Sequence, residues 1–331
     1  MRQGHHKYNS WKKRRDARIH EHELDRKRRT SSFRVVKKNV GKSKELKSTV
    51  PENFSLIDNF EMVTKYFNDL TILLSRDRIH NSLNFRMESI SNITADALMY
   101  LLTFIKNGRQ FSHLAEMRGH LPRDEKCKNF VKTSGFLKYL STNVETTSSE
   151  ENTFIRVGQN TSSIHIAELC NFVNNKFGTP RLFTNLLYNT IGEVMDNATK
   201  HAYSEKNSPL WQKWLMYSQF KNNTIRITIL DSGQGIIHSM HKKFAEKVFV
   251  PTDKELLVSA LKGEDRSATK QKYRNKGLPR ILANAMGKYF YKMVLITNKV
   301  CYNVENGIPT INEYENSIKG TLYYFELKKE Q

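Results

Sequence analysis

The sequence predicts an α/β (α+β) fold with two domains and a basic N-terminal arm. Strand and helix patterns alternate through residues 51–140, and a second series of helices and strands fills residues 163–331. Between them, residues 141–162 begin with a stretch rich in Ser, Thr, Glu and Asn that predicts a linker. The 331 residues, 38% of them hydrophobic, suffice for two cores. We expect the C-terminal domain to be a mixed sheet covered on one face by helices.

Residues 1–50 predict a basic, partly disordered arm. Positions 1–48 hold 17 Lys or Arg against 5 Asp or Glu, which is more than half of the formal net charge of +21. Without an apolar stripe, such a segment does not hold a helix in isolation. Three roles stay open for it: a solvated arm, nucleic-acid contact through residues 1–48, and docking to a protein partner.

Apolar spacing predicts the elements of residues 51–140, with Pro51 marking the start of folded sequence. Apolar residues at every second position predict strands, and a spacing of three or four predicts helices. The expected elements are strands at 54–57, 83–89 and 113–117, helices at 61–74 and 94–107, and a further helix after a turn at 119–122. This alternation is typical of a small α/β domain.

The most informative helix is expected to run through residues 180–203, after a helix at 164–177. Thr179 is a candidate N-cap, and Pro180 suits a first helical turn. From Leu182 onward, apolar residues keep a 3.6-residue period for more than four turns. This stripe predicts that one face of the helix packs on a core.

Glu193, Asn197 and His201 recur every four residues, so they form a polar column along one edge of the stripe. A carboxylate and an amide in one column can share a ligand. Because polar edges are also the ordinary solvated flank of an amphipathic helix, the column alone leaves both interpretations open. We expect His201 to pack or hydrogen-bond beside the site rather than to accept a phosphoryl group.

The next signal is a strand that ends in a glycine-rich turn. Residues 224–230 place three isoleucines on one face, and the sequence DSGQGI follows. Asp231 at the strand end provides a fixed acceptor, while Gly233 and Gly235 let the backbone bend closely around a ligand. Ordinary turns use the same residues, so the turn alone is a weak signal. It becomes a strong signal because it follows the helix that carries the polar column. Residues 210–220 are expected to pair with the strand as a hairpin.

The rest of the chain predicts a lid, a helix and closing strands. Residues 238–276 contain two short helical patterns and a basic segment. Arg274 and Lys276 either screen phosphate charge or belong to a solvated surface. A helix expected at 278–286 would offer its N-terminal N–H groups, near Gly277, to an anion. The closing strands are expected at 293–297, 300–304 and 322–327.

Four motifs, in this order, resemble the GHKL superfamily, the ATP-binding domain shared by DNA gyrase B, MutL and sensor histidine kinases. EVMDNATKHAY is similar to its N box, DSGQGI to its first glycine box, RNKGLPRI to its second, and KGTLYYFEL to its closing strand. The resemblance covers residues 163–328 and implies a Bergerat-type α/β sandwich that binds ATP with Mg²⁺. One departure bears on phosphate grip and lid movement: Leu278 and Pro279 follow Gly277, where the family carries more glycines.

The resemblance also implies residue roles. Glu193 is the implied general base, Asn197 the Mg²⁺ ligand, and Asp231 the acceptor for the adenine amino group. The implied nucleotide contacts are Asp231, Gly233, Gly235 and Thr321 around the adenine, Gly277 beside the phosphates, and Asn197, Ile236 and Leu278.

The carboxylate of Glu193 favours ATP hydrolysis, or phosphorylation of a protein Ser or Thr, over histidine autophosphorylation. Near a γ-phosphate, a carboxylate can deprotonate water or a hydroxyl. The N box is most similar to that of anti-sigma-factor serine kinases, so we expect an ATP-gated regulatory switch with a protein partner or phosphoacceptor. The alternatives are a non-catalytic ATP sensor and a nucleic-acid-associated ATPase, in DNA transactions or phage defence, that uses residues 1–48. An ATP-dependent homodimer is compatible with each.

The segment LNFRMESISNITADALMYLL, residues 83–102, resembles the central strand, loop and helix of STAS-like domains. The resemblance implies that residues 51–140 form a STAS-like domain, with Ser91 or Thr94 near a loop that is phosphorylated in that family. Capping a helix is the more ordinary use of Thr94, so neither residue is treated as a site.

Composition also bears on the cellular location of the protein and on its cysteines. No apolar run approaches the roughly 18 residues of a membrane span, and no signal-peptide core follows the basic start. We therefore expect a cytoplasmic protein without a membrane partner, and the resemblances above imply a bacterial one. The three cysteines, Cys127, Cys170 and Cys301, are widely spaced and predict neither a disulfide framework nor a metal cluster.

Overall fold

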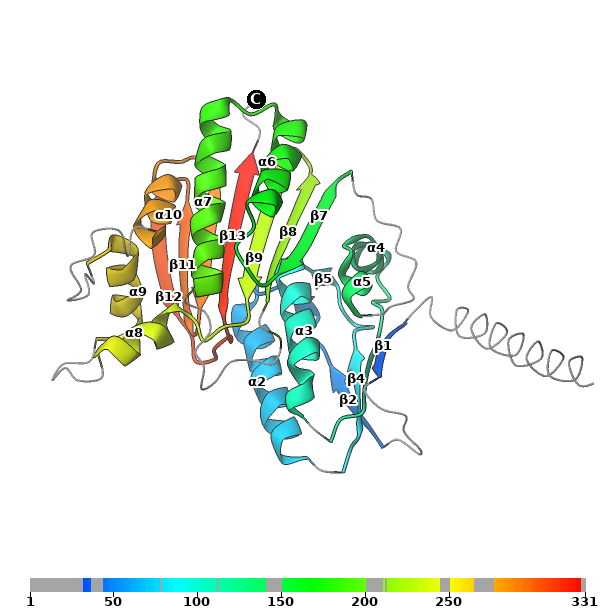
Figure 1. The fold of residues 1–331 in the computed structure, drawn as a ribbon. Coiled ribbons are helices and arrows are strands. Elements are labelled where there is room, and N and C mark those ends of the chain that lie inside the picture. The colour runs from blue at the N-terminus through cyan, green and yellow to red at the C-terminus, as the bar shows by residue number, and fades with distance from the viewer. Residues whose placement is uncertain are drawn as a thin grey trace, which may run out of the picture.

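The computed structural model describes residues 32–36, 44–77, 79–111, 113–140, 151–200, 211, 213–244, 251–264 and 277–328. His201, Arg274, Lys276 and most of the basic arm lie outside these residues. Figure 1 shows a large sheet with helices in front of it and a smaller α/β part below it, so the expected mixed α/β class is confirmed. Among the described helices, none combines the length and apolar content that crossing a bilayer requires.

The smaller part is built on a sheet that has four strands in the described residues, in the order β1-β6-β4-β2. These are β1 (Ser32–Val36), β2 (Glu45–Thr49), β4 (Ser82–Arg86) and β6 (Glu116–His120). Strands β2, β4 and β6 run parallel, whereas β1 runs antiparallel to β6. The other elements are α2 (Phe60–Arg76), α3 (Ala95–Asn107), η2 (Gly108–Gln110), α4 (Glu125–Thr133), α5 (Phe136–Leu140), and the paired strands β3 (Asn53–Phe54) and β5 (Asn92–Ile93).

Folded structure begins before Pro51, which corrects the expected boundary, because β1 and β2 lie in the segment assigned to the basic arm. Both are edge strands of their sheet. An edge strand is paired on one side only and tolerates polar side chains. Strand β2 has the sequence ELKST, and all its side chains are half-buried or exposed, so it lacks a clear apolar alternation.

The larger sheet has seven strands in the described residues, in the order β12-β11-β10-β13-β9-β8-β7. These are β7 (Thr153–Gly158), β8 (Trp214–Lys221), β9 (Thr224–Asp231), β10 (Lys292–Thr297), β11 (Val300–Glu305), β12 (Ile308–Glu313) and β13 (Thr321–Lys328). Each neighbouring pair of these strands is antiparallel, so the expected mixed sheet is wrong for this part. Two-residue turns with positive φ, at Asn222-Asn223 and Asn306-Gly307, favour such hairpins.

Strands β7 and β12 have no counterpart in the sequence analysis. Strand β7 lies in the expected linker and buries only Phe154. No residue of β12 is buried. Both strands are at the edges of the sheet, so backbone pairing places them there with little apolar burial.

Five helices pack on the front face of this sheet: α6 (Ser163–Phe177), α7 (Arg181–Lys200), α8 (Ile236–Phe244), α9 (Asp253–Lys262) and α10 (Gly277–Met286). Helix α7 confirms the predicted helix, and Leu187, Ile191 and Val194 are buried as its stripe requires. Leu182 is the exception, with 84% of its surface exposed in the first turn. The carbonyl of Pro180 accepts the Thr184 N–H at 3.0 Å, so Pro180 precedes the helix as its cap residue.

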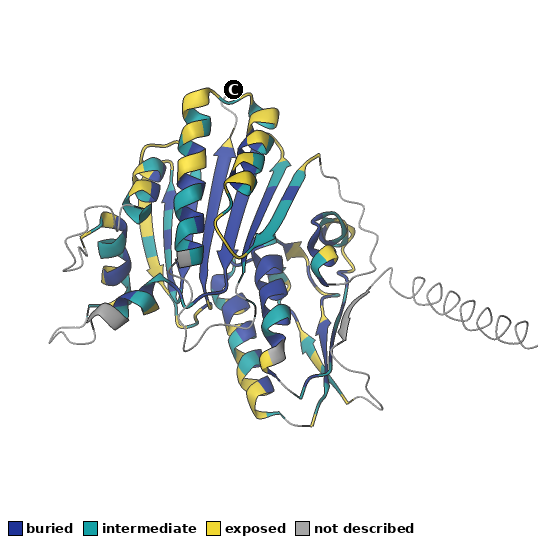
Figure 2. Cartoon of the chain, viewed as in Figure 1, coloured by how far each residue is buried: buried dark blue, intermediate teal, exposed yellow. Residues whose placement is uncertain are grey.

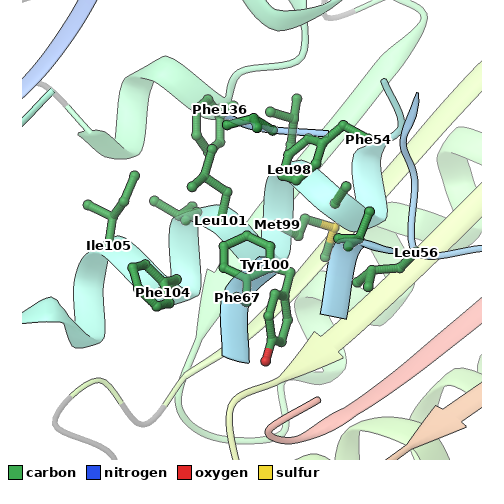
Figure 3. Packing of buried hydrophobic residues seen from close by; sticks show 14 of the residues in the cluster. Phe54, Leu56, Phe67, Leu98, Met99, Tyr100, Leu101, Phe104, Ile105 and Phe136 are labelled. Carbon is green, nitrogen blue, oxygen red and sulfur yellow. The ribbon is translucent and has the colours of Figure 1, made fainter. Parts of the chain in front are cut away.

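The smaller part covers the back face of the larger sheet. Along β8, Trp214 and Met216 pack toward the front helices, whereas Leu215 and Tyr217 join the core of the smaller part. Figure 2 shows these central strands as largely buried, and Figure 3 shows the rings and aliphatic chains of α2 and α3 in the shared core. The two parts therefore pack directly on each other through one continuous core.

Candidate functional site

The site is centred on Asp231, the last residue of β9. Its Cα lies opposite Trp214 of β8 on one side and Thr321 of β13 on the other. Only 3% of the residue is exposed. Its Oδ1 accepts the N–H of Gly233 at 2.8 Å, and Thr321 donates from both its backbone and its hydroxyl. Burial raises the pKa of Asp231 to about 7 in spite of these bonds, which is the kind of perturbation found at functional sites.

The turn after Asp231 is held by the turn between β10 and β11. Ile236 opens α8 and donates its N–H to Thr297 Oγ1 at 2.8 Å. The Asn298 amide donates to the Gln234 carbonyl at 3.0 Å. Gly235 has φ +84°, and a Cβ there would lie 2.4 Å from Asn298 Oδ1. The expected Gly233-Gly235-Ile236 turn is thus a rigid element with no room for a side chain at its second glycine.

Gly320 closes the turn from the other side. A Cβ at this position would lie 1.9 Å from the Asp231 carbonyl oxygen, and its φ is +98°. Because both strain and steric overlap oppose a side chain, Gly320→Ala is expected to lower the free energy of unfolding by more than about 3 kcal/mol. Denaturant unfolding measures this loss. Gly178→Ala is the matched control: its φ is +64° with nothing within 4 Å of the new Cβ, so it is expected to cost only about 1 kcal/mol. Equal losses in the two variants would contradict the close approach.

Tyr323 connects Asp231 to helix α7. The residue is 1% exposed, and its hydroxyl accepts the Asn197 Nδ2–H at 3.4 Å. Burial raises the pKa of this phenol, the Asn197 bond opposes the rise, and the charge of Asp231 adds to it. Sequence reasoning missed Tyr323, although alternation along β13 places it on the same face as Thr321.

Glu193, one turn before Asn197 on α7, lies at the start of α10. Its Oε1 is 2.7 Å from Arg280 Nη1. Its Oε2 would be 2.8 Å from a Cβ added to Gly277, so the carboxylate sits directly on the first residue of α10. Partial positive charge at a helix N-terminus favours a carboxylate there. Leu278 packs at the margin of the front core, and Arg280 is a second residue that sequence reasoning missed.

A second hydrogen bond joins the same two helices. Asn284 Nδ2 of α10 donates to Thr190 Oγ1 of α7 at 2.8 Å. Thr190 is fully buried, and its hydroxyl also donates to the Leu186 carbonyl at 2.8 Å. In addition to apolar packing, two polar contacts between described residues therefore join α7 and α10, the charged Glu193–Arg280 pair and the neutral Asn284–Thr190 hydrogen bond.

The structure brings the sequence-predicted residues into two neighbouring groups along α7. One group contains Asp231 and Thr321, with Gly233, Gly235 and Ile236 in the adjoining turn, and Asn197 is linked to it through Tyr323. The other contains Glu193, Gly277 and Leu278. Among the described residues, no three His, Cys, Asp or Glu side chains are grouped so that they could hold a metal ion. A divalent cation here would need oxygen atoms from a ligand as well as from the protein.

No protein-family model and no curated protein matches the chain. The chemistry of the site therefore rests on the contacts described above.

Proposed function

We propose that this protein binds Mg²⁺-ATP in the manner of the GHKL superfamily and uses Glu193 as a general base. The reaction is hydrolysis of ATP or phosphorylation of a protein Ser or Thr, and its role is that of an ATP-gated switch. The observation that carries the proposal is the buried Asp231 carboxylate at a strand end, fixed by Gly233 and Thr321 beside the polar edge of α7.

Asp231 and its turn suit an adenine ring. An exocyclic amino group donates well to a carboxylate that is already positioned by backbone and hydroxyl donors. A base without an amino group at that position would leave the buried carboxylate unpaired, so the arrangement favours adenine over such bases. A side chain at Gly235 would collide with Asn298, so this position of the turn carries none.

Asn197 suits a Mg²⁺ ion that also contacts phosphate oxygens. Its Nδ2 points to Tyr323, which orients the amide so that Oδ1 is the atom available to a cation. Mg²⁺ is commonly bound by one or two protein oxygens together with substrate phosphates. When bound, the ion would neutralise the charge of the phosphates.

The phosphate end of the proposed site is the start of α10. The N-terminal N–H groups of this ten-residue helix, at Gly277 and Leu278, offer donors to an anion. Glu193 lies against Gly277, which is where a base must lie to take a proton from a nucleophile at the γ-phosphate. One turn of α7 thus separates the proposed metal ligand from the proposed base.

A direct connection between the site and the smaller part supports the switch role. The loop before Thr321 contacts α2 and α3: Asn316 Nδ2 donates to Glu61 Oε1 at 2.7 Å, and Lys319 N–H donates to Tyr100 Oη at 3.1 Å. The rings of Phe60 and Tyr314 are 4.5 Å apart. Thr321, a proposed nucleotide contact, is therefore only two residues along the chain from Lys319, whose N–H bonds to α3.

Incubation of the purified chain with γ-labelled Mg²⁺-ATP tests the proposal. Label on a protein Ser or Thr indicates a kinase, and free phosphate without labelled protein indicates an ATPase. Saturable ATP binding with neither product indicates a sensor and removes the catalytic role of Glu193. A chain that neither binds ATP nor releases phosphate contradicts the proposal as a whole.

A further inference from the structure

A charged contact joins the proposed base to the proposed phosphate-binding helix. Glu193 Oε1 and Arg280 Nη1 are 2.7 Å apart. Gly277 and Arg280 are three residues apart on α10, so both reach the same carboxylate from one face of the first helical turn. Without nucleotide, Glu193 therefore engages the Arg280 guanidinium, a donor that an incoming phosphate could use.

We propose that Arg280 is a positioning residue that moves between Glu193 and the γ-phosphate. In the nucleotide-free protein it holds the Glu193 carboxylate. When ATP binds, the guanidinium transfers to γ-phosphate oxygens and leaves Glu193 able to accept a proton from water or a hydroxyl. This inference rests on the proposed function and adds to it the residue that senses the third phosphate.

Exposure and charge favour the exchange. The Arg280 side chain is 50% exposed and that of Glu193 is 25% exposed, so the pair is accessible to solvent and only weakly stabilising. A phosphoryl group offers the guanidinium more negative charge and two oxygens in a geometry that it binds bidentately. Nothing else has to unfold for the exchange, because Asn284 and Thr190 still hold the two helices together.

The consequence is a base that becomes available only with the correct nucleotide. With ADP there is no γ-phosphate to attract Arg280, so the pair with Glu193 persists. The arrangement predicts that Arg280 contributes to discrimination between ATP and ADP, whereas a purely structural ion pair would not.

Calorimetric titrations of the full chain with Mg²⁺-ATP and Mg²⁺-ADP test this inference. Arg280→Ala is expected to weaken ATP binding about 10- to 100-fold while changing ADP binding less than about threefold, because a charge-assisted contact is lost only with ATP. Arg280→Lys is expected to recover part of the ATP affinity. Glu193→Gln is expected to bind ATP about threefold more tightly than wild type, since it no longer competes for Arg280.

Asn284→Ala is the matched control. It removes the other hydrogen bond between α7 and α10, so it is expected to lower the melting temperature without changing the ratio of ATP to ADP affinity. If Arg280→Ala changes ATP and ADP affinity equally, or changes neither, the exchange is overturned. The proposed ATP-binding function would still stand. If the wild type does not bind ATP, or if Asp231→Asn binds it as tightly as wild type, the proposed function fails and the exchange fails with it.

Discussion

Glu193→Gln is expected to reduce phosphate release or phosphoryl transfer by about 10²- to 10⁴-fold, the usual contribution of a positioned general base. Gln has nearly the same shape, but its neutral amide neither forms an ion pair with Arg280 nor accepts the proton of the nucleophile. ATP binding is expected to persist. The result would therefore separate chemistry from binding in one substitution, which is the signature of a base.

Asp196→Asn provides the matched control for that experiment. Asp196 also lies on α7, where its Oδ1 accepts the Thr161 hydroxyl at 2.7 Å. The same loss of charge there is expected to leave turnover within about twofold of wild type, as for surface substitutions away from special features. Turnover by Glu193→Gln at the wild-type rate would remove Glu193 from the mechanism.

Asp231→Asn is expected to stabilise the unliganded protein and to abolish most ATP binding. Burial raises the folded-state pKa of Asp231 to about 7 from its ordinary value of 3.8. The folded state thus binds the extra proton, so the contribution of Asp231 to stability is greatest below pH 4 and is lost as pH rises toward 7. Asn carries no charge, so the variant escapes this loss, by at most about 4 kcal/mol above pH 7. Unfolding curves at pH 5 and pH 8 measure the difference.

The same titration governs ligand binding in the wild type. Only the ionised carboxylate is a strong acceptor for an amino group, so ATP affinity is expected to fall as pH drops below 7. Asp96→Asn is the control, because Asp96 is also buried, has a pKa raised by burial, and accepts the Leu56 and Ile57 N–H groups on the other side of the sheet. It is expected to leave ATP affinity unchanged. A pH-independent ATP affinity would count against Asp231.

Periodicity predicted the elements that bury a regular face. Helix α7 and strand β9 appear where their apolar spacing places them, and Gly233 and Gly235 form the expected turn. The pattern failed at β2, β7 and β12, because edge strands are held by backbone pairing and bury few side chains. It also failed at Leu182, since a spacing rule cannot show that the core ends before the helix does.

Sequence patterns could not predict the contacts between segments that are distant along the chain. Arg280 and Tyr323 meet Glu193 and Asn197 only after α7, α10 and β13 have packed. The covering of the back face by α2 and α3 was likewise not predicted, although the nearly continuous apolar run in β10, KMVLIT, is typical of a strand buried on both faces. Such runs indicate that a face is covered without identifying what covers it.

A calorimetric titration of the wild-type chain and Asp231→Asn with Mg²⁺-ATP at pH 8 tests the central claim most directly. We expect saturable binding by the wild type and a loss of about 100-fold or more in the variant, whose unfolding curve shows it to be at least as stable. Equal affinities in the two proteins, or no binding by the wild type, would contradict the assignment of Asp231 and the ATP-binding function with it.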